Sequence, residues 1–249
     1  MQHEGTDQKN CLNCSGLIAA NSKFCKHCGV VQVEQDDVSS EERWFTMQQI
    51  AIFYAIEIVC CIFSHIDAFK TFAGFIVVNV LLAINKVSFF FYNIAENRAI
   101  LRWPNFSFQK LCAYCGLALT FSIGVHYSVE WVNSAIWSDD NTYYYNLIGG
   151  GRYYAFLIVF FTAVCPAIFE ELGFRGYLLQ KLLKVVDPQQ AVFISSFLFA
   201  IIHMSFLSLF WLIPLALFLG YTRIREKTIW YGVFIHFSFN LGACLFELL

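Results

Sequence analysis

The sequence predicts an all-α membrane protein, a bundle of about seven transmembrane helices preceded by a small zinc-ribbon β domain. Two observations predict the bundle: 58% of the 249 residues are hydrophobic, and the mean hydropathy is +0.58. Only 14% of the residues are charged, which excludes an ordinary water-soluble domain. A third observation, two CxxC pairs near the N-terminus, predicts the ribbon.

The first pair is CLNC and the second is CKHC, ten residues further on. Their four cysteines, Cys11, Cys14, Cys25 and Cys28, suit one tetrahedral zinc, and the Zn–thiolate bonds supply folding energy that so short a segment lacks. We therefore predict a structural zinc ribbon over residues 1–32. Two disulfides are the alternative pairing of the same cysteines, and His27 is a competing ligand inside the second knuckle.

An acidic, polar stretch at 33–44 lacks apolar periodicity and is predicted to be a linker. The transmembrane domain then fills residues 45–249. Its hydrophobic windows, each long enough for a hydrocarbon core of about 30 Å, lie at 46–66, 70–94, 109–134, 154–180, 189–207, 208–222 and 228–248. The boundary near Ser205–Ser208 is the weakest, and the sequence leaves a re-entrant or broken arrangement open there.

Lysine and arginine favour the cytoplasmic side of membrane proteins. A cytoplasmic N-terminus places twelve of the sixteen on that side and leaves only Lys70 and Arg152 on the other. The prediction is a multi-pass protein of the cell membrane with its N-terminus in the cytoplasm. The polar loop SDDNTYYYNLIGGGRYY then lies on the exoplasmic side.

The stretch IFEELGFRGYL places three ionisable groups inside an apolar segment, where each costs several kcal/mol unless it is paired or used. Glu171 and Arg175 are four residues apart and are expected to form an ion pair on one helix face. Glu170 has no local partner, and a carboxylate held out of water in this way is suited to general base catalysis. Glu57 and Lys86, on the first two spans, are expected to form a structural pair.

Two later helices supply groups that could meet Glu170. Phe199 and His203 lie one turn apart in FLFAIIHMSF, and His236 and Asn240 have the same spacing in VFIHFSFNLG. A single intramembrane histidine is equally often a helix–helix contact, so the constellation matters more than either pair. We expect the carboxylate, both imidazoles and the amide to share one water-filled pocket below the cytoplasmic face.

The motifs EELGFR, FAIIH and HFSFN, in this order, resemble those of the CPBP intramembrane proteases, the CAAX protease and bacteriocin-processing (Abi) family. The resemblance covers roughly residues 156–249. It implies an intramembrane endopeptidase whose Glu170 activates water, positioned by His203, while His236 and Asn240 stabilise the oxyanion. Glu171 and Arg175 would form the structural pair.

The resemblance also implies that the partners are membrane lipid and a peptide or protein substrate. Lipidated peptides and proteins are among the candidate substrates. The sequence leaves a catalytic metal open, with zinc the candidate, because one glutamate and two histidines make up some zinc sites; glutamate-activated water is the favoured mechanism. The ribbon is a candidate site for a cytoplasmic protein partner, and its few cations make it a poor nucleic-acid surface. A non-catalytic immunity or scaffold protein and, after it, a proton-coupled transporter are the alternative functions.

Overall fold

The computed structural model describes residues 8–11, 14–20, 22, 25–28, 39–104, 106–136 and 153–248. Contacts between residues divide the chain into two compact units, Met1–Arg43 and Trp44–Leu249, which are described separately below. Half of the predicted linker (33–38) and most of the predicted exoplasmic loop (138–152) lie outside the described residues.

The N-terminal unit contains a two-stranded antiparallel sheet. Strand β1 (Gln8–Asn10) pairs with β2 (Leu17–Ala19), and Lys9 lies opposite Ile18. Ile18 is buried together with Cys11 and Cys25, and these three residues form the described core of this unit. So few apolar residues cannot stabilise a fold alone, and cross-linking through a metal is the usual remedy in a unit of this size.

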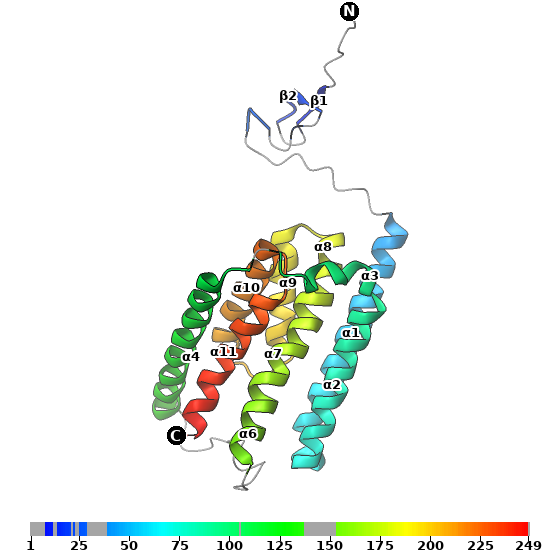
Figure 1. Cartoon of the computed structure of the whole chain (residues 1–249). Helices are drawn as coiled ribbons and strands as arrows, with labels where there is room; N and C mark the ends of the chain where they lie inside the picture. Colours follow the sequence, from blue (N-terminus) through cyan, green and yellow to red (C-terminus); the bar gives the residue numbers. More distant parts are fainter. Residues whose placement is uncertain are drawn as a thin grey trace, which may run out of the picture. The chain divides into compact units, whose positions relative to one another are not determined.

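The second unit is a helical bundle (Figure 1). Its helices in chain order are α1 (Ser40–His65), α2 (Phe72–Tyr92), α3 (Ile94–Asn97), α4 (Phe108–Ile136), α6 (Tyr154–Val159), α7 (Cys165–Glu170), α8 (Leu179–Val185), α9 (Pro188–Ile201), α10 (Leu209–Glu226) and α11 (Trp230–Leu248). Two short 3₁₀ turns, η1 (Asp67–Phe69) and η2 (Arg98–Leu101), connect neighbouring helices. Two π-helical segments, η3 (Phe160–Val164) and η4 (Glu171–Leu178), join α6, α7 and α8 into one continuous helix.

Five of the described helices are long and apolar enough to cross a membrane: α1, α2, α4, the continuous helix Tyr154–Val185, and α11. The sequence predicts its fifth crossing at 189–207, but α9 ends at Ile201. Its 14 residues span only about 21 Å at 1.5 Å per residue. The broken arrangement left open near Ser205–Ser208 is thus the one found, and α10 returns from it with Pro214 inside the helix. The all-α bundle and its small β unit are confirmed.

Local sequence explains where several helices begin. The side-chain oxygen of Thr71 accepts a hydrogen bond from the amide of Gly74 at the start of α2. Asp187 accepts from the amides of Gln189 and Gln190 at the start of α9, where Pro188 occupies the first helical position. Both are standard N-terminal caps, because the first amides of a helix have no partner within it.

Small residues let neighbouring helices approach closely. Helices α4 and α11 lie side by side (Figure 1), and a Cβ at Gly242 of α11 would sit 2.6 Å from Oγ of Ser122 on α4. Close backbone approach of this kind is the usual source of attraction between helices in lipid, where the hydrophobic effect gives little help.

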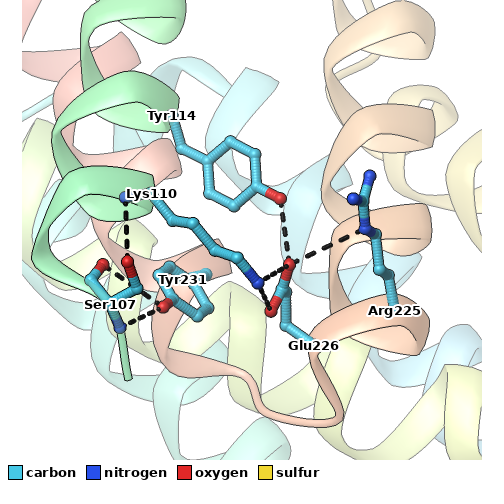
Figure 2. Close-up of polar contacts among 6 residues, drawn as sticks. All are labelled: Ser107, Lys110, Tyr114, Arg225, Glu226 and Tyr231. Atoms are coloured by element: carbon cyan, nitrogen blue, oxygen red, sulfur yellow. Dashed lines mark hydrogen bonds and ion pairs between the residues drawn. The ribbon is translucent and has the colours of Figure 1, made fainter. Parts of the chain in front are cut away.

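A polar cluster joins the start of α4 to the end of α10 and to α11 (Figure 2). Lys110 Nζ donates to both carboxylate oxygens of Glu226, at 2.9 and 3.1 Å, and the hydroxyl of Tyr114 donates to Oε1 at 3.1 Å. The hydroxyl of Tyr231 accepts from the Ser107 amide at 2.8 Å. Burial raises the pKa of the Glu226 carboxyl, but the bonds from Lys110 and Tyr114 outweigh burial and hold the pKa below its usual range.

Candidate active site

One cavity of about 960 Å³ contains the polar residues singled out by the sequence. Glu170, His203, His236 and Asn240 all line it, although they come from α7, the segment after α9, and α11. The structure therefore places the carboxylate, both imidazoles and the amide in the wall of one cavity. Their chemical roles stay predictions at this point.

Glu170 is the last residue of α7 and lies between the two π-helical segments. The first of these precedes Pro166, whose ring clashes with the carbonyl four residues earlier in a regular α-helix; a wider turn relieves that clash. Such π turns often occur at functional sites because they re-aim neighbouring side chains. The side chain of Glu170 is 19% exposed, and its Oε2 is buried without a hydrogen bond within the described part of the chain.

Glu171 and Arg175 form the predicted ion pair, with Nη1 of Arg175 donating to Oε1 at 2.8 Å. Both side chains are almost fully buried, at 0% and 2% exposure. The guanidinium also donates to the backbone carbonyl of Ala216 at 3.3 Å and lies 4.4 Å above the ring of Phe199. A cation held by an anion, a carbonyl and an aromatic face in this way is fixed in one geometry.

The ion pair extends to His236, which the sequence does not reveal. Nδ1 of His236 lies 3.1 Å from Oε1 of Glu171. An ionised carboxylate can only accept, so Nδ1 carries the hydrogen and Nε2 faces the cavity, 3.8 Å from Oε2 of Glu170. Glu171 thus sets the tautomer and the orientation of His236, a relation that only the tertiary structure creates.

His203 is oriented by a backbone carbonyl. Its Nδ1 lies 2.9 Å from the carbonyl oxygen of Phe199 and must donate to it, which leaves the Nε2 lone pair of the neutral ring for the cavity. The sequence expects the Phe199 ring beside His203, and the two ring centres are 5.0 Å apart. The same fully buried ring also contacts His236, at 5.8 Å, so Phe199 is the common packing partner of three polar side chains.

A second, more apolar groove of about 650 Å³ reaches Glu170 from between α2 and the continuous helix. Lys86 lies in its wall and pairs with Glu57 at 2.5 Å, which confirms the predicted pair. Asn85 donates to the same carboxylate at 2.7 Å, and the sequence gives no sign of this bond. Asn79 lines both the groove and the larger cavity, so the two spaces adjoin beside Glu170.

The four N-terminal cysteines form a separate candidate metal centre, in which all four sulfur atoms lie within 4.8 Å of one another. The Sγ atoms of Cys11 and Cys28 are 3.6 Å apart, and those of Cys14 and Cys25 are 3.7 Å apart. A tetrahedron with Zn–S bonds of about 2.3 Å places its sulfurs about 3.8 Å apart, whereas a disulfide needs about 2.05 Å. Four cysteines in this arrangement can bind a metal ion such as zinc.

His27 is not part of that centre. Its Nε2 lies 3.2 Å from the carbonyl oxygen of Leu17, and its ring packs against Gly16. The backbone amide of His27 instead donates to Sγ of Cys25 at 3.3 Å, as the amide of Cys14 does to Cys11 at 3.5 Å. Amide bonds to sulfur stabilise the thiolate form that a metal requires.

Comparison with protein families adds a further finding. Residues 152–242 match the family model described as Type II CAAX prenyl endopeptidase Rce1-like. This part of the chain is similar to that family. The match covers a little more than a third of the chain and includes Glu170, Glu171, Arg175, His203, His236 and Asn240. No curated protein and no solved structure matches the chain.

The Rce1-like family indicates a protease of the CAAX type, and the five apolar helices indicate a multi-pass membrane protein. The first three spanning helices and the cysteine centre lie before the matched residues. Two of these helices, α1 and α2, contribute residues to the cavity wall. The candidate site is therefore larger than the part of the chain that the family model matches.

Proposed function

We propose that this protein is an intramembrane endopeptidase of the CAAX-protease type, which hydrolyses a peptide bond with water activated by Glu170. One observation supports the proposal above the others: a carboxylate, two oriented imidazoles and an amide from three parts of the chain line one cavity within membrane-spanning helices. The family match over the same residues agrees with it.

In the proposed mechanism Glu170 accepts a proton from water and later passes it to the leaving amine. His203 presents the Nε2 lone pair toward the cavity and so can hold the same water by accepting its second hydrogen. His236 and Asn240 then face the oxygen that becomes negative in the tetrahedral intermediate. Because Nδ1 of His236 already donates to Glu171, donation from Nε2 requires the imidazolium, and the Glu171 carboxylate stabilises that charge.

A catalytic metal would change one assignment. If Glu170 and the two histidines bound zinc, Glu171 would have to act as the base. Glu171 is fully buried and is engaged by both Arg175 and His236, so it is poorly placed to meet a water in the cavity. The geometry therefore favours Glu170 as the base, and a chelator tests whether a metal assists it.

The substrate we propose is a peptide or protein with an apolar segment, lipidated ones included. The groove between α2 and the continuous helix supports this, because it is predominantly apolar and reaches Glu170 from residues that face lipid. An apolar segment in this groove would place a neighbouring peptide bond beside the cavity.

The test uses the purified full chain and a farnesylated CaaX peptide, with and without a chelator. Glu170→Gln and His203→Ala should each lower the rate by about 10²-fold or more, as expected for loss of a general base or its partner. Ile168→Ala, on the same helix but exposed to lipid, is the matched control and should retain activity. If Glu170→Gln and the control have equal activity, the protease proposal is refuted, and a scaffold or transport function becomes the better explanation.

For the N-terminal unit we propose that the metal is zinc, that its role is structural and that the unit serves a cytoplasmic protein partner. The sulfur spacings support the first point, because they agree with a tetrahedral thiolate site. The second point follows from the size of the unit, whose described buried core is Ile18 with two of the cysteines.

A further inference from the structure

Arg223, in the last turn of α10, is a buried cation that the proposed mechanism does not use. The residue is only 6% exposed. Its guanidinium makes one hydrogen bond within the described residues, from Nη2 to the side-chain oxygen of Gln180 on α8. The Nε atom is buried without a partner, and no carboxylate pairs with this guanidinium in the part of the chain that the structure describes.

Such an arrangement is costly for the protein alone. A guanidinium has five N–H donors in a planar fork, and one neutral amide satisfies only a part of them. A cation held out of water is normally paired with an anion as well as hydrogen-bonded. Arg175 meets this requirement, because it is equally buried and has the carboxylate of Glu171 at 2.8 Å. Arg223 has no such partner among the described residues.

The charges around Arg223 do not supply the missing anion. Lys181 and Lys184 of α8 share the single carboxylate of Glu96, at 3.3 and 2.8 Å. With Arg223 these groups leave an excess of two positive charges. Glu226, three residues after Arg223, is already bound by a lysine and a tyrosine of α4 (Figure 2). The excess charge therefore attracts an anion from outside the described residues.

We define the α8–α10 corner as Gln180, Lys181, Lys184 and Arg223. We propose that this corner binds a phosphate group, from a lipid headgroup or free in solution. Phosphate oxygens match the parallel donors of a guanidinium, so the unused donors of Arg223 would obtain a charged partner. Gln180 is half-buried and the Lys184 side chain is 31% exposed, so a phosphate can reach the corner.

The position of the corner also suits a phosphate. The sequence predicts that this end of the bundle lies at the cytoplasmic surface of the membrane, because lysine and arginine gather there. The phosphate groups of anionic lipids lie at the same depth, and basic sites between the ends of spanning helices are a common place for such headgroups.

Substitutions on α10 separate this site from the general positive charge of the helix end. Arg223→Met removes the buried guanidinium and keeps much of the apolar stem. Arg225→Met is the matched control, because it removes the same charge from a side chain that is 77% exposed. In Figure 2 the Nε atom of Arg225 lies beside Glu226, at 3.8 Å from Oε1. Arg223→Lys keeps the charge and removes the planar fork.

The full chain is purified in dodecylmaltoside without anionic lipid, and its melting temperature is measured in phosphate-free buffer. One arm adds phosphatidylglycerol, with phosphatidylcholine at the same mole fraction as the reference, since its headgroup has no net charge. The other arm adds inorganic phosphate in place of chloride at constant ionic strength. The dependence of the melting temperature on the concentration of each probe gives the dissociation constant.

Without an added anion, Arg223→Met should melt at or above the temperature of the parent, because an unpaired buried cation has been removed. The active probe should raise the melting temperature of the parent and of Arg225→Met. The dissociation constant should increase at least about 10-fold in Arg223→Met and less than about 3-fold in Arg225→Met. The value for Arg223→Lys should lie between those of the parent and Arg223→Met, because one charge without the fork replaces only part of the contact.

A response to phosphatidylglycerol alone would assign the corner to a lipid headgroup, and a response to inorganic phosphate without lipid would show that a free phosphate suffices. No response of the parent to either probe would overturn the proposal. Equal weakening in Arg223→Met and Arg225→Met would overturn it too, since surface charge would then explain the binding. If Arg223→Met melts below the parent without an anion, or fails to fold, the protein's own groups satisfy Arg223 and the proposal is wrong. None of these measurements depends on peptide hydrolysis.

Discussion

Replacement of Arg175 by methionine isolates the contribution of the buried ion pair. Methionine fills most of the volume and removes the cation that neutralises Glu171. Glu171 would keep one polar contact, Nδ1 of His236 at 3.1 Å, while its Oε2 already has no hydrogen bond within the described residues. The variant therefore leaves a carboxylate, 0% exposed, with only an imidazole beside it.

Breaking a buried pair by removing one partner costs about 3–5 kcal/mol, because the remaining charge stays out of water. We expect Arg175→Met to lower the free energy of unfolding by that amount. The double variant Glu171→Leu/Arg175→Met removes both charges and should recover at least half of the loss. The unrecovered part is the unpaired Nδ1 of His236, worth about 1–3 kcal/mol.

Equilibrium unfolding of the purified protein in mixed micelles, followed by circular dichroism, measures these values. Peptide hydrolysis should not return in the double variant, because His236 has lost the carboxylate that orients it. A loss below about 1 kcal/mol in Arg175→Met would refute the reasoning, since a surface-like pair contributes no more than that. A double variant no more stable than the single one would refute it equally.

Three further predictions follow from other contacts. In Gly232→Ala the new Cβ would sit 2.7 Å from Oε2 of Glu171, so hydrolysis should fall about 10-fold or more from small misplacement of the site, whereas Gly116→Ala, with nothing within 4 Å, should not change it. The folded pKa of Glu226 lies below the value of about 4.3 in an unfolded chain, so its contribution to stability is present above that pH and disappears as the pH falls through the folded pKa. Glu226→Gln should therefore flatten the acid limb of the melting temperature against pH, and an unchanged limb would contradict this. Elemental analysis should find about one zinc per chain, lost in Cys14→Ser; full occupancy in that variant would exclude the four-sulfur site.

The cysteine centre shows how far local spacing alone can reach. Two CxxC pairs hold their ligands close together in the chain, so the sequence restricts the geometry and the structure agrees. The Glu171–Arg175 pair is predictable for the same reason, because four residues make one turn. Hydrophobic length likewise predicts the bundle, although α9 ends earlier than its hydropathy suggests.

Contacts between helices were beyond such reasoning. The bond from His236 to Glu171 joins residues 65 positions apart, and Asn85 reaches Glu57 across 28 positions. No spacing rule connects such residues, since the rotation and depth of each helix depend on packing against all the others. The π turns beside Glu170 also change which face each side chain occupies.

The sequence by itself determined the class of the protein, the cysteine centre and the set of polar residues that a membrane does not tolerate without a purpose. Only the tertiary structure decided that Glu171 orients His236 and that Glu170, His203, His236 and Asn240 line one cavity. The physical reason is that composition and short-range spacing fix local geometry and membrane insertion. The shape of an internal space instead depends on how distant side chains fill it or leave it open.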